Sequence, residues 1–264
     1  MEKVEQFKQK NKKEEIYNNM YISYEEAMKI VKVAINDLCR KQGVCSRREA
    51  DRLLEAGRIT VDGVVAECGQ QVDESSIICI DGSRISEEKP EDILMAFNKP
   101  RGIVCTTTDN QGKNNIVDYI GYDKRIYPVG RLDKDSDGLI LLTNNGEITD
   151  KILRSVNGHE KEYVVKVNKN ITDIFLKSMS KGIYLKELEV TTKPCKINRI
   201  NSDTFRIILT QGLNRQIRRM CQELGYKVVE LTRIRIMNIE LGGLKCGEYR
   251  LVEGAEKKKL YESL

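Results

Sequence analysis

The stretch GRLDKDSDGLILLTNNG, residues 130–146, holds three acidic side chains, Asp133, Asp135 and Asp137. This spacing also opens an EF-hand calcium loop, in which the twelfth position must be a bidentate Glu. That position is Asn144, and the apolar run at 139–142 predicts a buried strand where an EF-hand needs a helix. The spacing therefore excludes a calcium loop and leaves a solvated turn or an active site.

Asp133 differs from its acidic neighbours in having a basic residue close by. Asp135 and Asp137 match ordinary turn chemistry, because a short acidic residue before Gly is common in turns. Arg131 lies two residues before Asp133, and an extended backbone would place both side chains on one face. An arginine beside a carboxylate keeps it ionised, as a nucleophile or general base requires. From these residues alone, a structural ion pair is the favoured interpretation.

The segment NRQIRRMCQELG, residues 214–225, predicts a short helix with arginines around an apolar stripe. Asn214 is a good N-cap and Gly225 a good terminator. Arg218 falls at the edge of the stripe, where a guanidinium can turn inward to a carboxylate and stay charged. Arg215 and Arg219 point further out. The expected buried stripe consists of Ile217, Met220, Cys221 and Leu224.

Basic residues cluster in this part of the chain although the formal net charge of the 264 residues is only +5. Across 215–235 there are six Lys or Arg against two Glu, a clustering typical of proteins with an anionic partner. We expect the same surface to include Lys99, Arg131, Lys134, Gln216, Arg233 and Arg235.

The eight cysteines are scattered, and no two of them form a C-x-x-C pair. His159 is the single histidine, so we expect no metal centre. The stretch MEKVEQFKQKNKKEEIYNN is charged throughout and lacks the features of a secretory signal, so we expect reduced thiols in a cytoplasmic protein. The sequence contains no apolar run of membrane-spanning length.

Composition divides the chain into four parts. We expect a polar extension at 1–32, a compact unit at 33–82, a polar linker with Pro90 at 83–92, and a larger domain at 93–264. The larger domain alternates short strand patterns with scattered helices. This order predicts an α+β fold with a mixed, mainly antiparallel sheet and flanking helices. Strands are expected at ILMAF, GIVCTT, GLILLT, KEYVVKV, FRIILT and RIRIMNIEL, and helices at NNIVDYI, GEITDKILRS, ITDIFLKSMSKG and RQIRRMCQELG.

The compact unit combines a basic helix with a small β element. Ser46 and Glu49 form a capping box, and Asp62-Gly63 predicts a two-residue hairpin. Three arginines lie off the buried face of the helix, namely Arg47, Arg48 and Arg52. They are candidate RNA contacts, although charges alone favour a solvated face with helical ion pairs.

Two sets of motifs resemble known families. GVCSRREADRLLEAGRITVDG, residues 43–63, resembles the S4 RNA-binding domain, of the αL type, in which this helix and turn lie against RNA. Upstream, Ala34 and Asp37 depart from positions that are often basic in the family. YPVGRLDKDSDGLILLTNNGE, with FNKPRGIVCTT, HEKEYVVKV and QGLNRQIRRMCQELGY, resembles the pseudouridine synthases of the RsuA/RluA superfamily. The match covers nearly all of the larger domain and looks most like the RsuA/RluB/E/F branch.

The resemblance implies isomerisation of uridine to pseudouridine in RNA without a cofactor or metal. Asp133 is similar to the essential carboxylate of the family, which acts as a nucleophile or as a base. Tyr163 matches the tyrosine that stacks on uracil, and Arg218 matches the arginine that pairs with the Asp, with Arg215 as the second choice. Arg219 is expected to meet phosphate. The target base must leave its stack to reach a buried carboxylate.

The substrate that the resemblance implies is 23S ribosomal RNA near the peptidyl-transferase region, with a transfer RNA anticodon as the alternative. A monomer is the expected oligomeric state. The competing hypothesis is a non-enzymatic S4-type RNA-binding protein with a decayed synthase domain. The presence of Asp133, Tyr163 and Arg218 together favours the enzyme.

Overall fold

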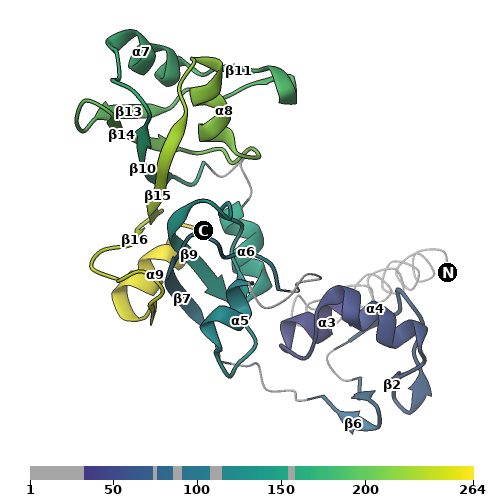
Figure 1. Cartoon of the computed structure of the whole chain (residues 1–264). Helices are drawn as coiled ribbons and strands as arrows, with labels where there is room; N and C mark the ends of the chain where they lie inside the picture. The colour runs from purple at the N-terminus through teal and green to yellow at the C-terminus, as the bar shows by residue number, and fades with distance from the viewer. Residues whose placement is uncertain (1–32, 74–75, 86–90, 108–114, 154–157) are drawn as a thin grey trace, which may run out of the picture. The chain divides into compact units, whose positions relative to one another are not determined.

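The computed structural model describes residues 33–73, 76–85, 91–107, 115–153 and 158–264. The chain forms two compact units, Met1–Pro90 and Glu91–Leu264, and each is considered by itself (Figure 1). The predicted polar extension at 1–32 and residues 86–90 of the predicted linker lie outside the described residues.

The smaller unit packs two helices against short strands. The helices are α3 (Ile35–Lys41) and α4 (Arg47–Glu55), and β1 (Val33–Ala34) pairs with β4 (Gln71–Val72). A four-stranded sheet has the order β3-β2-β5-β6, with β2 at Ile59–Val61, β3 at Val64–Val65, β5 at Ile78–Ile80 and β6 at Ser83–Arg84. Because β6 pairs with β5, this unit extends into the first residues of the predicted linker.

Local signals in the smaller unit act as the sequence predicts. The hydroxyl of Ser46 accepts a hydrogen bond from the backbone N–H of Glu49 at 3.1 Å and caps α4. Asp62 and Gly63 both have positive φ, 51° and 83°, as a primed hairpin turn requires. The buried face of α4 consists of Ala50, Leu53 and Leu54.

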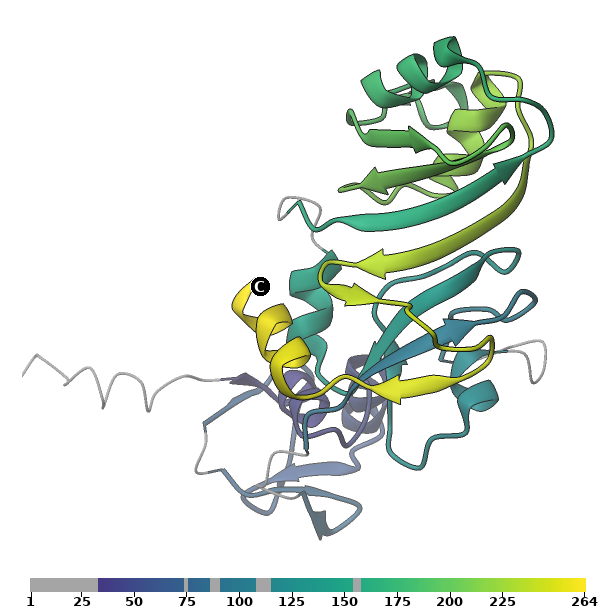
Figure 2. The same cartoon turned by 90° about the vertical axis from the view of Figure 1, so that its left-hand side faces the viewer.

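The larger unit is built on one mixed sheet, whose main path runs β13-β14-β10-β15-β9-β7-β17 (Figure 2). Within the described residues, β15 and β9 form the one parallel pair of this sheet. The α+β prediction is thus confirmed. The bounds are β7 Leu94–Lys99, β8 Tyr127–Pro128, β9 Asp137–Thr143, β10 Lys161–Val167, β13 Lys196–Arg199, β14 Thr204–Leu209, β15 Val228–Ile236, β16 Ile239–Glu240 and β17 Tyr249–Leu251.

The helices divide between the two ends of this sheet. In Figure 2, α7 and α8 lie with β13 and β14 at one end, and α5, α6 and α9 lie with β7, β9 and β17 at the other. Their bounds are α5 Ile116–Ile120, α6 Gly146–Leu153, α7 Asp173–Lys181, α8 Gln216–Glu223 and α9 Gly254–Glu262. A short ribbon of β11 (Tyr184–Leu185) and β12 (Val190–Thr191) encloses the 3₁₀ turn Lys186–Leu188.

Strand β9 is buried on both faces, as its uninterrupted apolar run predicts. Ile140 and Leu142 belong to one hydrophobic core, and Leu139 and Leu141 belong to another. The predicted strand GIVCTT is wrong, because the backbone there makes only an isolated bridge between Val104 and Asn115.

The parallel contact of β9 with β15 sets the position of the loop that precedes β9. Gly138 pairs with Arg233 on β15, and Arg233 pairs on its other side with Tyr163 of β10. The loop at 130–136 therefore enters the sheet beside the middle of β10 and β15. The Asp of the G-R-L-D motif and Tyr163 are brought together by this pairing.

We expect Gly138→Ala to lower the free energy of unfolding of the larger unit by about 3 kcal/mol or more. Gly138 has φ +99°, and an added Cβ would press on the Arg233 carbonyl oxygen and lie 2.8 Å from the Arg233 nitrogen. Urea unfolding followed by tyrosine fluorescence measures the loss.

The matched control is Gly102→Ala. Gly102 has a similar φ of +91° but no heavy atom within 4 Å of an added Cβ, so only backbone strain of about 1–2 kcal/mol is expected. An equal loss in both variants would contradict a role for the close approach of β9 to β15.

Candidate active site

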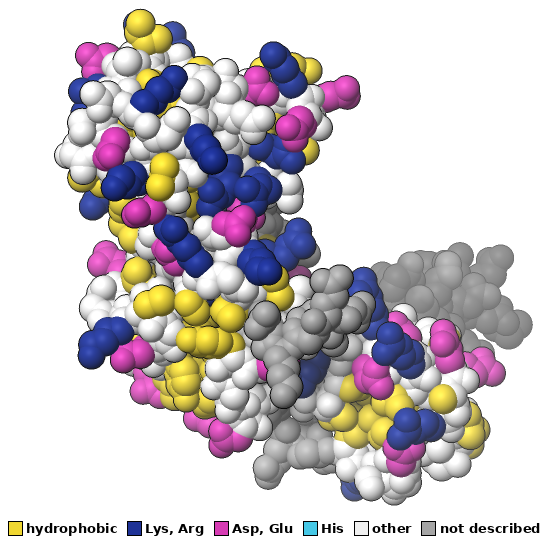
Figure 3. All heavy atoms as spheres, viewed as in Figure 1, with side chains coloured by type: hydrophobic (Ala, Val, Ile, Leu, Met, Phe, Trp, Pro, Cys, Tyr) yellow, Lys and Arg dark blue, Asp and Glu magenta, His cyan; other side chains and the backbone are white. Residues whose placement is uncertain are grey.

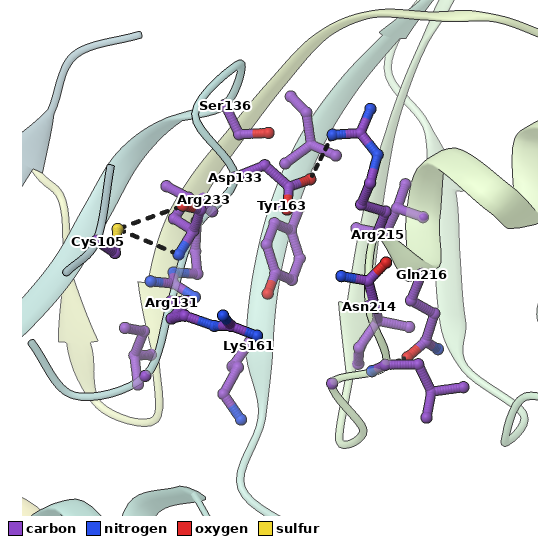
Figure 4. Close-up of a pocket in the computed structure, with 18 of the residues that line it drawn as sticks. Cys105, Arg131, Asp133, Ser136, Lys161, Tyr163, Asn214, Arg215, Gln216 and Arg233 are labelled. Atoms are coloured by element: carbon purple, nitrogen blue, oxygen red, sulfur yellow. Dashed lines mark hydrogen bonds and ion pairs between the residues drawn. The ribbon is translucent and has the colours of Figure 1, made fainter. Parts of the chain in front are cut away.

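Asp133 lies at the wall of a cavity of about 790 Å³ in the larger unit (Figure 4). The lining comes from the loop before β9, from β10 and β15, and from the segment that leads into α8. Residues far apart in the sequence thus meet at one place. This cavity falls within the volume range of small-molecule sites.

The Asp133 carboxylate faces two guanidinium groups. Its Oδ2 lies 3.6 Å from Nε of Arg218 and 3.7 Å from Nη1 of Arg215. The side chain is 29% exposed, so solvent or a ligand can still reach it. Both arginines proposed from the sequence for this pairing are therefore at the carboxylate.

Arg218 is fixed by the turn that follows Asp133. Its Nη2 donates to the carbonyl oxygen of Asp135 and to the hydroxyl of Ser136, both at 3.0 Å. Burial lowers the pKa of this guanidinium and repulsion from Arg215 adds to the effect, whereas Asp133 opposes it. An arginine remains charged under such a shift, so a fixed positive charge stands beside Asp133.

The start of α8 differs from the prediction. Asn214 is not the N-cap; that position belongs to Arg215, which has φ 50° and makes no side-chain capping bond. The Asn214 carbonyl and side-chain oxygens instead accept from Arg219 at 3.0 and 3.3 Å. The left-handed turn at Arg215 precedes the helix and accompanies the approach of its side chain to Asp133. Gly225, with φ 74°, follows the end of the helix as predicted.

Tyr163 projects from β10 into the same cavity. It is 9% exposed and stands opposite Arg233 on β15 and Ile207 on β14. Figure 4 shows its ring below Asp133, between the loop before β9 and the segment that carries Asn214 and Arg215. A largely buried ring that lines a cavity offers an aromatic face for stacking on a base.

Cys105, which precedes the loop in the chain, holds the loop backbone from inside. The thiol of Cys105 donates to the Leu132 carbonyl oxygen and accepts from the Leu132 N–H, each at 3.3 Å (Figure 4). Burial raises the pKa of this thiol, which keeps its proton for the donated bond. This role could not be predicted from the sequence, because an isolated cysteine carries no motif.

Lys99 does not lie on an RNA-binding surface, and that prediction is wrong. The residue is fully buried, and its ammonium donates to the carbonyl oxygens of Pro100 and Ile103 at 2.8 and 2.9 Å. Burial lowers its pKa, although Cys105, Asp137 and Asp133 oppose the shift. Lys99 therefore orders the backbone that leads to Cys105.

Asp137 has a structural role that the turn interpretation missed. One carboxylate oxygen accepts from Nε of Arg101 at 2.7 Å, and the other accepts from the Thr232 hydroxyl. The bond from Thr232 ties the first residue of β9 to β15, and the bond from Arg101 ties it to the segment after β7. Asp135, by contrast, is an exposed turn residue as predicted, with its side chain 70% exposed.

Three predicted RNA contacts are engaged within the protein instead. Gln216 is buried and accepts from the Leu213 N–H at 3.0 Å. Arg219 forms an ion pair with Glu187, and Arg235 forms ion pairs with Glu160 and Glu162. Acidic partners on other elements, which local spacing does not reveal, engage the two arginines, and the nearby backbone engages Gln216.

Arg131 and Lys134 are exposed residues of the cavity lining, as expected for RNA contacts. Residues 131–133 are not a strand, however, and no ion pair joins Arg131 to Asp133 in the described part of the chain. The predicted support of Asp133 by Arg131 is thus wrong, and Arg215 and Arg218 take that place.

Positive charge dominates the cavity. Among the described residues that line it there are six Lys or Arg and one carboxylate, which belongs to Asp133. Figure 3 shows Lys and Arg side chains gathered over the middle of the larger unit. No group of three or more His, Cys, Asp or Glu in the described ranges is placed to hold a metal ion. None of the helices that the structure describes combines the length and apolar character needed to cross a membrane.

The basic helix of the smaller unit is partly neutralised. Nε of Arg47 donates to Asp37 at 2.6 Å, and Arg52 pairs with Glu49 at 3.3 Å. Arg48 is exposed on the same helix. Asp37, the acidic departure noted in the sequence, therefore holds one of the three candidate RNA-binding arginines.

Comparison with known families identifies both units. A family model described as RNA pseudouridylate synthase matches residues 93–223, and the S4 domain model matches residues 35–78. The two matched regions fall in the two compact units. The region matched by the synthase model contains Asp133, Tyr163, Arg215 and Arg218.

Individual proteins give the same result. The chain is 49% identical to the dual-specificity RNA pseudouridine synthase RluF of Escherichia coli (strain K12), over 83% of this chain and 74% of that protein. It is 35% identical to the ribosomal large subunit pseudouridine synthase B of Bacillus subtilis (strain 168), over 83% and 91%. A crystal structure of a pseudouridylate synthase shares the fold, with a TM-score of 0.63 at 24% identity, over 88% of this chain and 100% of that one. This chain therefore belongs to the RNA pseudouridylate synthase family and carries an S4 domain.

Proposed function

We propose that this protein converts uridine to pseudouridine in RNA, with Asp133 as the catalytic carboxylate. The position of Asp133 carries the proposal. Its carboxylate faces the cavity with Arg218 and Arg215 at 3.6 and 3.7 Å, and Tyr163 lies beside it. Such a site can hold one nucleotide and leave room for its base to turn.

The reaction rearranges atoms already present in the nucleotide. The C1′–N1 bond breaks, the uracil turns so that C5 faces C1′, and the C5–C1′ bond forms. C5 loses a proton and N1 gains one, so no electron acceptor or added group is needed. Asp133 acts as a nucleophile on the nucleoside or as a base that removes the 2′ proton of the ribose. Both roles need an ionised carboxylate, and the guanidinium groups of Arg215 and Arg218 lie beside that of Asp133.

The cavity suits a detached uracil, which carries negative charge until C5 rejoins the sugar. Cationic side chains held by the fold stabilise such charge without having to reorganise. Stacking on Tyr163 would keep the ring in the site while it turns. A nucleotide within a duplex cannot reach this cavity, so the target uridine is flipped out of its stack.

We infer that ribosomal RNA of the large subunit is the substrate, with transfer RNA as the second candidate. The relatives are named as a large-subunit pseudouridine synthase and as a dual-specificity RNA pseudouridine synthase. The expected cytoplasmic location and monomeric state remain predictions. The alternative of a decayed, non-enzymatic RNA-binding protein is disfavoured, since Asp133, Tyr163 and Arg218 meet at one cavity.

Asp133→Asn is expected to remove pseudouridine formation while RNA affinity changes little, because a neutral amide can act neither as the nucleophile nor as the base. Pseudouridine mapping in total RNA from a deletion strain that expresses each variant measures the outcome. The control is Asp135→Asn, the same change at an exposed position of the same turn. Modification by Asp133→Asn at the level of this control would refute the assignment.

Arg218→Met is expected to lower kcat by about 100-fold or more, because it removes a fixed charge beside the reacting carboxylate. Single-turnover assays on the substrate RNA, before it is modified, measure the rate of the chemical step. Arg219→Met is the matched control, since Arg219 lies in the same helix but pairs with Glu187. Similar rates for the two variants would show that the charge at Arg218 has no part in the reaction.

Replacing Arg47, Arg48 and Arg52 together by Ala should weaken RNA binding and reduce the slope of log K against log salt by about 1–2. The slope falls by less than three phosphate contacts would give, because Arg47 and Arg52 are already paired within the protein. The opposite change, Asp37→Asn, should release Arg47 and tighten binding at low salt. Filter binding at several salt concentrations tests both signs, and an unchanged slope in the triple variant would exclude this helix from the RNA contact.

A further inference from the structure

The cavity contains a second group of positive charges away from Asp133. Arg131, Lys161 and Arg233 all line it, and the chemistry assigned to Asp133 does not use them. In Figure 4, Lys161 lies below the Tyr163 ring and Arg131 and Arg233 lie to its left, on the side away from Arg215. These three residues are called the lower cationic cluster.

Arg233 is the most buried member of the lower cationic cluster. It is 3% exposed, and its Nε donates to the Leu139 carbonyl oxygen at 2.7 Å. Its Nη2 is buried without a hydrogen-bond partner in the described part of the chain. A buried guanidinium nitrogen at a cavity wall with an unused N–H is costly unless a ligand accepts from it.

Lys161 lacks a counter-charge as well. It lines the same wall two residues before Tyr163, and no carboxylate of the described residues forms an ion pair with Lys161, Arg131 or Arg233. Burial lowers the pKa of Lys161, and repulsion from Arg233 lowers it further. Two like charges therefore approach each other in a partly desolvated site.

The neighbouring residues show that acidic partners are available to these strands. Arg235, two residues after Arg233, has Glu162 at 2.6 Å and Glu160 at 3.0 Å. Both carboxylates come from the same stretch of chain as Lys161. The lower cationic cluster thus stays unpaired, although Arg235 on the same strand as Arg233 is paired with two carboxylates.

An anion is the ligand that these unpaired charges fit. A uracil carbonyl could accept one hydrogen bond, but it would leave the repulsion between Lys161 and Arg233 uncompensated, whereas a phosphate carries both charge and several acceptors. Residues two apart on a strand are separated by about 7 Å, similar to the distance between the base of a nucleotide and its own phosphate. A base stacked on Tyr163 would then place its phosphate near Lys161.

We propose that Lys161 and Arg233, with Arg131 at the edge, form a subsite for a phosphate of the target nucleotide. The proposal rests on the proposed function in taking a uridine nucleotide as the occupant. Once the C1′–N1 bond has broken, the uracil is free to turn. The phosphate subsite then holds the ribose, so that C1′ stays beside Asp133. Lys161 and Arg233 are positioning residues for this step.

Nucleotide binding tests this subsite independently of catalytic activity. Uridine, uridine 5′-monophosphate and uridine 3′-monophosphate are titrated into the full-length protein and followed by NMR chemical-shift changes. We expect one monophosphate to bind about tenfold or more tightly than uridine, as charge-assisted hydrogen bonds imply. Lys161→Met should abolish that preference, and Lys161→Arg should restore it.

Lys166→Met is the matched control, because Lys166 belongs to the same strand and does not line the cavity. It should keep the preference for the monophosphate. Equal binding of uridine and both monophosphates by the unmodified protein, including no binding of any of them, would overturn the subsite, and so would a preference that persists in Lys161→Met. If the protein modified no RNA, the proposed function would fail, yet this titration would still decide the phosphate subsite.

Discussion

The close parallel contact of β9 with β15 is the constraint on which the site depends. At Gly138 the backbone of β9 approaches Arg233 so closely that no Cβ fits. This contact brings the loop that carries Asp133 over the middle of the sheet, next to Tyr163 on β10. The hydrogen bond from the Thr232 hydroxyl to Asp137 joins the same two strands. The Asp133 carboxylate is therefore positioned by strand pairing, and the loop sequence alone does not position it.

The regular elements were predictable because their signals are local. The apolar run of β9, the alternation of β10 and the stripe of α8 each follow from the spacing of side chains in the sequence, and so does the Asp62-Gly63 turn. Arg218 near Asp133 was also foreseen, since the stripe of α8 places it at the border, whereas Arg215 was only the second choice for this pairing. In these cases local spacing was sufficient.

The features that the sequence did not reveal depend on contacts between distant segments. Burial of Lys99 depends on the carbonyls of Pro100 and Ile103 turning toward its ammonium. The turn at Arg215 replaces Asn214 as the cap because the chain reaches α8 through a left-handed residue. Arg219 forms an ion pair with Glu187 in another element, and the Cys105 thiol forms hydrogen bonds with the backbone of Leu132. Each depends on tertiary structure, which has no signature at the residue itself.

Positive charge in the cavity is of two kinds, and the difference explains how one site can hold a nucleotide while its glycosidic bond is broken. The guanidinium of Arg218 is already committed to Asp133, Ser136 and the backbone, so its charge is fixed before any ligand arrives. Arg233 is buried and Lys161 is half-buried at the same cavity wall without an anion, and this part of the cavity is destabilised until an anion binds. Fixed charge near the carboxylate suits a reaction in which negative charge appears on the base. Uncompensated charge further along the strand suits a group that is anionic throughout, which in a nucleotide is the phosphate. The same sheet thus separates the part of the substrate that must move from the part that must stay in place.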